Sequence, residues 1–233
     1  MHIVWDWNGT LLDDLDHMVD AVNHCRQAIG EPGVDAVTYR QKHCLPSRVF
    51  HDRLNGRPVT DDEWTTIQKT FAQQMVDRLP PVRAGVAALL FKMAAQGHSQ
   101  SLLSLTADAQ LRREVARTHL NIFFQRIDGR HEPDTPKSVA LSHHLAALGE
   151  PDRRRVVLIG DTADDAEAAR ACGVRAVLHS GGFELPESLR AAGVPVVDSL
   201  NAAARRAVKQ PTRATEQPSI PDIGPRHDAR RHR

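Results

Sequence analysis

The chain has 233 residues, of which 41% are hydrophobic and 25% are charged, and its formal net charge at pH 7 is +1. This composition is typical of a folded globular protein, and the balanced charge gives no electrostatic reason to expect a nucleic-acid partner or an acidic membrane surface. The three cysteines (Cys25, Cys44 and Cys172) form no C-x-x-C pair, which argues against a disulfide framework or a cysteine zinc site.

The first predicted element is a buried strand over residues 2–5, because a short apolar run ends at Asp6 and a turn-forming segment follows it. A carboxylate this close to the first residue is incompatible with a secretory signal peptide. No apolar run approaches the roughly 20 residues that are needed to cross a bilayer. We therefore expect a cytoplasmic protein without a membrane partner.

Residues 13 to about 80 carry amphipathic helical patterns, and no alternating strand pattern separates these helices. The two clearest patterns cover Leu15–Ala28 and Asp61–Leu79. This stretch is therefore predicted to be a helical insertion.

From Pro80 and Pro81 onward, helical and strand patterns alternate. The predicted helices are Val86–Ala95, Ala109–His119, Ser138–Leu148 and Asp164–Cys172. The predicted strands are Ser101–Leu105, 125–127, Val156–Ile159, Val174–Leu178 and Val194–Val197. This alternation predicts an α/β fold, a doubly wound parallel sheet with helices on both faces. We expect residues 1–14 and 82–208 to form this core, residues 15–81 the insertion, and residues 209–233 a disordered basic tail.

Residues that are suited to chemistry follow three of the predicted strands or precede a helix. Asp6, Ser104 and Asp161 lie at or just beyond strand ends, and Lys137 lies in a loop before a helix. Ligands of an open parallel sheet bind outside the carboxyl ends of its strands. These four residues are therefore expected to meet at one edge of the sheet.

The strongest local signal is the segment Asp6-Trp7-Asn8-Gly9-Thr10. A carboxylate at a strand end is rigidly held and faces the ligand, and a nearby glycine lets backbone N–H groups approach an anion closely. Such a carboxylate can act as a nucleophile and form an aspartyl-phosphate. The alternative is that the acid and the amide only satisfy the hydrogen bonds of a turn.

A second acidic group follows the most strand-like run of the chain. Asp161 and Asp165 are four residues apart and are expected on one side of a helix start. Mg²⁺ prefers oxygen ligands and is usually held by one or two carboxylates together with substrate phosphate and water. Capping of the helix by Thr162 or Asp164 explains one of these acids but not all three. Asp165 is either a ligand or a residue that orients a neighbour.

Lys137 and Ser104 are weaker candidates when each is taken alone. A lysine before a helix is usually solvated, and a buried hydroxyl in an apolar run can bond its own backbone. Thr106 competes with Ser104, because it lies two residues further on and on the same face of the strand.

In this order, the four motifs resemble the haloacid dehalogenase superfamily. The pattern of that family is D-x-D-G-T at the first strand, then a Ser or Thr, then a Lys, and then G-D-x-x-x-D. This chain has Asp6-Trp7-Asn8-Gly9-Thr10, Ser104, Lys137, and Gly160-Asp161 with Asp165. The resemblance implies a Rossmann-like core with a helical cap, as in the phosphoglycolate-phosphatase-like branch, and magnesium-dependent hydrolysis of a small phosphorylated substrate.

The resemblance also implies metal ligands and a nucleophile. Asp6 is the implied nucleophile and a metal ligand, the backbone carbonyl of Asn8 a second ligand, and Asp161 a third, with Asp165 nearby. The implied cofactor is Mg²⁺.

A second implied set binds the phosphoryl group. Ser104 and Lys137 would hold its oxygens, and Gly9 and Thr10 would complete the substrate-binding turn. Phosphoryl transfer depends on positioning and charge stabilisation, which is what these residues supply.

The sequence departs from the family pattern at Asn8, where the phosphatases carry a second Asp. That Asp protonates the leaving oxygen and then activates water, and an amide can do neither, although such help is worth ~10²–10⁴-fold in rate. Three explanations stay open. The substrate has a good leaving group, such as an acyl phosphate; another group (Asp13, Asp14 or a cap residue) supplies the proton; or the protein is a catalytically weak binding or regulatory module.

Two other reactions fit the sequence less well. Dehalogenases of the superfamily also lack the second Asp, but the retained Gly9-Thr10 and the acidic segment Asp161–Asp165 favour metal and phosphate. A dinucleotide-dependent oxidoreductase requires G-x-G-x-x-G after the first strand, and the first turn lacks it. Candidates for contact with an anionic substrate, or for a solvated charged face, are Arg40, Lys42, Arg48 and Arg53. The sequence leaves the substrate and the oligomeric state open.

Overall fold

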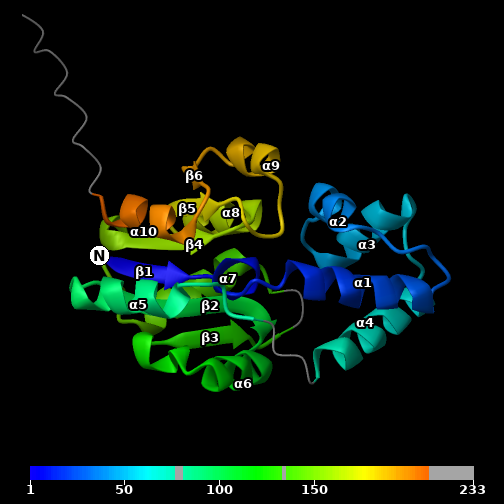
Figure 1. Cartoon of the computed structure of the whole chain (residues 1–233), viewed down its shortest axis with the longest axis horizontal. Coiled ribbons are helices and arrows are strands. Elements are labelled where there is room, and N and C mark those ends of the chain that lie inside the picture. Colours follow the sequence, from blue (N-terminus) through cyan, green and yellow to red (C-terminus); the bar gives the residue numbers. More distant parts are fainter. Residues whose placement is uncertain (77–80, 133–134, 210–233) are drawn as a thin grey trace, which may run out of the picture.

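The computed structural model describes residues 1–76, 81–132 and 135–209. Its centre is a six-stranded sheet of order β3-β2-β1-β4-β5-β6, and all of its strand pairs are parallel. The strands are β1 (His2–Trp5), β2 (Ser99–Ala107), β3 (Ile127–Arg130), β4 (Val156–Gly160), β5 (Arg175–His179) and β6 (Val196–Val197). The predicted doubly wound α/β fold is therefore confirmed (Figure 1).

Helices cover both faces of the sheet. Successive residues of each strand point to opposite faces, so the apolar core divides into two clusters. One apolar cluster joins Ile3 and Trp5 of β1 to α5 (Val86–Ala95), α6 (Asp108–Thr118) and α10 (Leu200–Val208). A second cluster joins Val4 to α7 (Lys137–Ala147) and α8 (Ala163–Ala171). The central strands are apolar on both sides, as buried parallel strands require.

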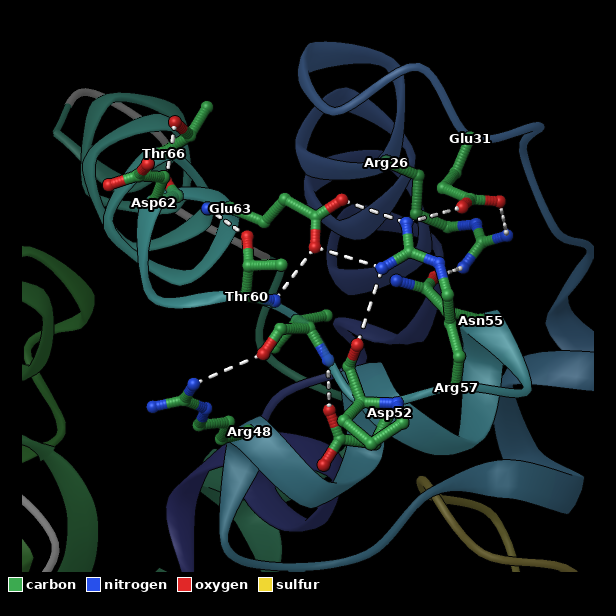
Figure 2. Close-up of polar contacts among 12 residues, drawn as sticks. Arg26, Glu31, Arg48, Asp52, Asn55, Arg57, Thr60, Asp62, Glu63 and Thr66 are labelled. Atoms are coloured by element: carbon green, nitrogen blue, oxygen red, sulfur yellow. Dashed lines mark hydrogen bonds and ion pairs between the residues drawn. The ribbon is translucent and has the colours of Figure 1, made fainter.

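The segment after β1 forms a separate helical group beside the carboxyl ends of the strands (Figure 1). It contains α1 (Leu15–Ala28), α2 (Ala36–Lys42), α3 (Ser47–Asn55) and α4 (Asp61–Met75). Polar contacts fix its loops, because Arg57 pairs with Glu31 at 3.0 Å and with Glu63 at 2.8 Å, and Thr60 and Glu63 cap the start of α4 reciprocally (Figure 2).

The two chain segments that join this helical group to the sheet lie side by side. Leu12 and Val82 form an isolated antiparallel bridge, and the backbone N–H of Asp13 donates to the carbonyl of Pro81 at 2.9 Å. The division into residues 1–14 with 82–208 and residues 15–81 is consistent with this geometry and remains a prediction. The predicted tail lies almost wholly outside the described residues.

Most predicted elements agree with the structure, with shifts of a few residues at their ends. The expected strand 101–105 extends over Ser99–Ala107, and the expected strand 125–127 lies at Ile127–Arg130. The patterns did not separate α2 and α3 or anticipate α9 (Pro186–Ala191) and α10. None of the three cysteines, all of them in the described part of the chain, is in a disulfide. Among the described residues, no helix combines the length and the apolar character that a membrane span needs.

A buried polar network lies near the amino ends of the strands. The ring nitrogens of His2 contact the hydroxyls of Ser99 and Ser101, both at 2.8 Å. Ser101 also contacts His144 at 2.7 Å, and His144 contacts Asp128 at 2.7 Å. Burial, followed by the charges of His144 and the N-terminus, lowers the pKa of His2 to about 4.

We predict that His2 makes the fold sensitive to acid. An unfolded histidine binds its proton near pH 6.5, whereas folded His2 resists protonation until about pH 4. Its contribution is therefore complete above pH 6.5 and is lost as the pH falls from 6.5 toward 4. Between pH 7.5 and pH 5, His2→Gln should lose less unfolding free energy than the parent does, by on the order of 1–2 kcal/mol. Urea unfolding at both pH values measures this.

His143→Gln, at an exposed position of α7, is the matched control and should keep the parental pH dependence. Equal losses in the parent and in His2→Gln would contradict the prediction.

Candidate active site

Three buried carboxylates converge at the carboxyl edge of the sheet. Asp6 follows β1, Asp161 follows β4, and Asp165 lies in the first turn of α8. One oxygen from each lies within 4.8 Å of the others. The expectation that distant strand ends bring Asp6 and Asp161 together is thus met geometrically, although their chemical roles remain predictions.

Lys137, the first residue of α7, reaches into this cluster and contacts two of the acids. Its ammonium group pairs with Asp6, and it lies 2.5 Å from the nearer oxygen of Asp165. Burial alone would lower the pKa of Lys137, but the carboxylates of Asp165 and Asp6 raise it above its usual range. Lys137 is therefore a buried cation held between two acids and not a solvated lysine.

Burial dominates the electrostatics of Asp6 and Asp161. It raises the pKa of Asp6 to about 7, against the opposing effect of Lys137. It also raises the pKa of Asp161 well above its ordinary value, and the charges of Asp6 and Asp165 raise it further. The charged forms of these acids are therefore disfavoured in the protein alone, because a buried charge is costly unless it is paired.

Both oxygens of Asp161 accept a hydrogen bond from a neighbouring segment. The hydroxyl of Thr10 donates to Oδ1 at 2.7 Å, and the backbone N–H of Phe183 donates to Oδ2 at 2.7 Å. Gly9 and Gly182 also press against this carboxylate, since an added Cβ at either would lie within 2.3 Å of its Oδ2. Asp161 is thereby fixed in one orientation.

The turn after Asp6 is irregular. The N–H of Leu12 reaches back to the carbonyl of Trp7 at 2.9 Å, and Gly9 has φ +68°, a conformation that favours glycine. His179 Nε2 contacts the carbonyl of Gly9 at 3.0 Å, while its Nδ1 accepts from the N–H of Gly181 at 3.1 Å. Burial, and then the charge of an arginine beside it, lowers the pKa of His179 to about 4, which agrees with a neutral ring that donates and accepts.

The side chain of Asn8 is hydrogen-bonded on both sides. Its Nδ2 donates to Asp14 at 2.8 Å, and its Oδ1 accepts from Thr106 at 2.6 Å and from Ser104 at 3.4 Å. Asp14 also accepts from the N–H of Gly9 at 2.6 Å, and burial raises its pKa. Both candidate hydroxyls thus reach Asn8, so the choice between Ser104 and Thr106 stays open.

Asp165 has several protein partners. One oxygen accepts from the N–H groups of Asp161 (3.2 Å) and Thr162 (3.1 Å) and from the hydroxyl of Thr162 (2.7 Å), and the other faces Lys137. These contacts favour a role for Asp165 in orienting Lys137 and the start of α8, and not a role as a direct metal ligand.

The helical group covers one side of the site with aromatic and basic side chains. Tyr39 of α2 packs against Phe183, with ring centroids 6.0 Å apart. Arg40 donates to the carbonyls of Ser180 and Glu184, both at 2.8 Å, and His43 lies 3.6 Å from Glu184.

The four basic candidates for substrate contact differ in their surroundings. Arg40 bridges to the core as described, whereas Arg48 bonds Val59 and Asp61 within the helical group. Lys42 and Arg53 are exposed. Arg48 therefore makes its described contacts within the helical group.

The acidic cluster fits a hard divalent cation. Asp6 and Asp161 offer carboxylate oxygens, the ligand type that Mg²⁺ prefers, and a cation would offset the uncompensated charge of the three buried acids. Among the residues that the structure describes, Asp161 accepts from neutral donors and forms no ion pair with a basic side chain, so a divalent cation would take the place of the proton that its raised pKa favours.

Sequence reasoning missed three residues that shape the site: Arg83, His179 and Phe183. Arg83 and His179 contact a backbone carbonyl, and Phe183 donates its own backbone N–H. Contacts of this kind leave no recognisable pattern in the sequence. The short glycine pair Gly181-Gly182 was the only local signal of a close approach.

Comparisons with known proteins agree with this geometry. A family model described as haloacid dehalogenase-like hydrolase matches residues 3–179. The chain is 29% identical over 193 residues to a phosphoglycolate phosphatase of Synechococcus elongatus, covering 82% of this chain and 88% of that protein. It is 24% identical over 204 residues to the probable phosphatase IndB of Dickeya dadantii, covering 84% and 87%.

Solved structures share the fold at lower identity. A predicted phosphatase from Clostridium acetobutylicum superposes with a TM-score of 0.74 at 18% identity, covering 88% of this chain and 96% of that one. A haloacid dehalogenase-like hydrolase from Bacteroides fragilis gives 0.75 at 17% identity, covering 86% and 98%.

We predict that a divalent cation stabilises the fold through Asp161. Binding to the folded state alone adds about 2.7 kcal/mol when the ion is at 100 times its Kd. Millimolar MgCl₂ or MnCl₂ should therefore raise the Tm of the parent protein, and this increase should vanish in Asp161→Asn. Asp108→Asn, which alters an acid outside the cluster, should keep it. An unchanged metal-dependent rise in Asp161→Asn would refute the assignment.

Proposed function

Because the chain belongs to the haloacid dehalogenase-like hydrolase family, we propose that it is a magnesium-dependent phosphohydrolase that acts on a small phosphorylated metabolite through an aspartyl-phosphate at Asp6. One observation carries this proposal: Asp6, paired with Lys137, lies beside Asp161 at the carboxyl edge of the sheet. Such an edge is where ligands of this fold bind.

In the first half-reaction, a carboxylate oxygen of Asp6 attacks phosphorus, a P–O bond to Asp6 forms, and the bond to the leaving oxygen breaks. Lys137 and Ser104 (or Thr106) would offset the charge on the phosphoryl oxygens, and the turn at Gly9 and Thr10 would hold the group in place. In the second half-reaction, water attacks phosphorus, releases phosphate and restores the carboxylate.

The proposed ligands of Mg²⁺ are the carboxylates of Asp6 and Asp161 and the backbone carbonyl of Asn8, with Asp165 nearby. The ion would supply positive charge that orients and neutralises the phosphoryl group. Residues 15–81 are proposed to be the cap, since Tyr39 and Arg40 already contact the loop that holds Asp161. A closed cap would exclude water during the first half-reaction.

Because Asn8 cannot protonate the leaving oxygen, the three explanations given for the missing acid still apply. An acyl phosphate or anhydride needs no acid. Asp14 contacts the amide of Asn8 directly, whereas Asp13 is 57% exposed and pairs with Arg83 at 3.1 Å. These contacts favour Asp14 over Asp13 as the alternative acid.

The second candidate function is a catalytically weak or non-catalytic binding or regulatory protein of the same fold. The same substitution, Asn8 in place of an acid, is the observation that favours it. Hydrolysis assays separate the two functions. Because curated relatives include phosphoglycolate phosphatases, 2-phosphoglycolate is the first monoester to test, followed by a panel of phosphorylated metabolites.

We expect the purified protein to hydrolyse acetyl phosphate or p-nitrophenyl phosphate in the presence of Mg²⁺, measured as phosphate release. EDTA and Asp6→Asn should each abolish the activity, because they remove the cation and the nucleophile. Asp108→Asn is the control for a carboxylate outside the site. Faster turnover of acetyl phosphate than of 2-phosphoglycolate and sugar phosphates would support the good-leaving-group explanation. Undiminished activity in Asp6→Asn would overturn the mechanism.

We predict that Asn8→Asp weakens the fold unless Asp14 changes with it. An aspartate at position 8 would face the carboxylate of Asp14, where the amide now donates at 2.8 Å. The loss should be about 1–3 kcal/mol in unfolding free energy. The double variant with Asp14→Asn restores an amide–carboxylate pair in reversed order and should regain much of it, as urea unfolding can measure.

The same double variant tests the missing acid. If the absence of an acid at position 8 limits turnover, the rate on 2-phosphoglycolate should rise relative to the rate on acetyl phosphate. Only the poor leaving group of 2-phosphoglycolate needs a proton from the protein. An Asn8→Asp protein as stable as the parent at pH 8 would contradict the predicted repulsion.

A further inference from the structure

Arg83, which lies just before α5 where the chain returns from the helical group, donates to backbone carbonyls of two separate loops. Its Nε contacts the carbonyl of Thr10 at 3.1 Å. Its Nη2 contacts the carbonyls of Gly9 at 3.0 Å, Leu12 at 3.2 Å and Gly181 at 3.2 Å. One guanidinium group thus joins the turn after β1 to the loop after β5.

These two loops are the ones that hold Asp161. The turn after β1 supplies the hydroxyl of Thr10 to Oδ1, and the loop after β5 supplies the N–H of Phe183 to Oδ2, both at 2.7 Å. The carboxylate therefore keeps its orientation only while both loops keep their positions.

Close packing makes this dependence strict. A Cβ at Gly9 would lie 2.3 Å from Oδ2 of Asp161, and a Cβ at Gly182 would lie 2.1 Å from it. The backbone of each loop is therefore in contact with the carboxylate, so a small drift of either loop changes the space that the carboxylate occupies.

We propose that Arg83 is a positioning residue for Asp161, which it orients by clamping the two loops that hold both carboxylate oxygens. The inference rests on the proposed function in one respect, the role of Asp161 as a metal ligand. Arginine suits this task because its planar fork presents several donors in fixed directions, whereas a lysine ammonium cannot serve the same carbonyls together.

Arg83 also contacts the segment that leads from the sheet into the helical group. Its backbone N–H donates to the carbonyl of Leu11 at 2.9 Å, and its Nη1 lies 3.1 Å from Asp13. Both of these partners belong to the outgoing connection, so the same residue contacts the proposed cap's connection and the loops around Asp161.

Three variants test the proposal: Arg83→Met, Arg83→Lys and the control Arg175→Met. Arg175 likewise donates to backbone carbonyls, those of Ala207 at 3.0 Å and Arg206 at 3.3 Å, but it lies at the amino end of β5. The probe is Mn²⁺, whose Kd is measured by titration without substrate. Loss of a residue that orients a ligand typically weakens metal affinity by about 10–100-fold.

We expect Arg83→Met and Arg83→Lys to bind Mn²⁺ that much more weakly, while Arg175→Met keeps the parental Kd even where its Tm falls equally. Amide hydrogen exchange should accelerate in peptides covering residues 7–12 and 180–184 in the Arg83 variants only. A parental Mn²⁺ affinity in folded Arg83→Met overturns the proposal, as does unchanged exchange in both peptides.

Chemical rescue separates positioning from a general loss of stability. The side chain of Arg83 is 21% exposed, so Arg83→Ala leaves a site that a small cation can enter from solvent. Methylguanidinium should restore Mn²⁺ affinity in Arg83→Ala and methylammonium should not, because only the first has the fork geometry. Equal effects of the two cations would mean that charge alone matters and would overturn the clamp.

Failure of the Arg83 proposal can be distinguished from failure of the proposed function. A parent protein that binds Mn²⁺ but hydrolyses no phosphate ester defeats the proposed function and leaves the clamp intact. Phosphate release by a parent whose Arg83→Met variant binds Mn²⁺ normally defeats the clamp alone. A parent that binds no divalent cation overturns both.

Discussion

The structure depends on one electrostatic constraint, the burial of three carboxylates and one ammonium at the end of a parallel sheet. Asp6, Asp161 and Asp165 have oxygens within 4.8 Å of one another, and Lys137 pairs with two of these acids. Such a cluster is unfavourable unless every charge has a partner. Lys137 serves Asp6 and Asp165, whereas Asp161 has only neutral donors among the described contacts. A divalent cation or a proton would therefore complete the cluster, and the raised pKa of Asp161 is the sign of this unmet charge.

The fold meets this constraint with backbone as much as with side chains. The sheet delivers Asp6 and Asp161 to one edge, because adjacent parallel strands β1 and β4 end together. Glycines at positions 9 and 182 let two loops reach the carboxylate of Asp161 more closely than any other residue would allow. Arg83 then holds both loops by the carbonyls of Gly9 and Gly181, and buried His179 contacts the carbonyl of Gly9 and accepts from the N–H of Gly181. Preorganised dipoles of this kind need no rearrangement when charge develops on a substrate.

The sequence predicted those parts of the site that follow from periodicity and strand ends. Apolar runs located β1 and β4, and the rule for parallel sheets then placed Asp6 next to Asp161 without any knowledge of contacts. Short helices such as α2 and α3 were merged into one insertion, because seven to nine residues give too little periodicity to define their ends. The clamp by Arg83 was invisible for a different reason. A side chain that donates to carbonyls is indifferent to the residues that own them, so no pattern records the contact.

The partners of Asn8 give a physical reason for an amide at that position. Its nitrogen donates to Asp14 and its oxygen accepts from Thr106 and Ser104, so it needs a donor on one side and an acceptor on the other. An amide offers both, whereas an ionised carboxylate offers acceptors only. Asp14 is fully buried, so an acid at position 8 would remove the amide donor from its carboxylate and place a like charge beside it. Positions 8 and 14 therefore form one hydrogen-bonded unit. In the proposed mechanism, attack by Asp6 requires no acid at position 8, so the substitution would bear on the departure of the leaving group and on the activation of water.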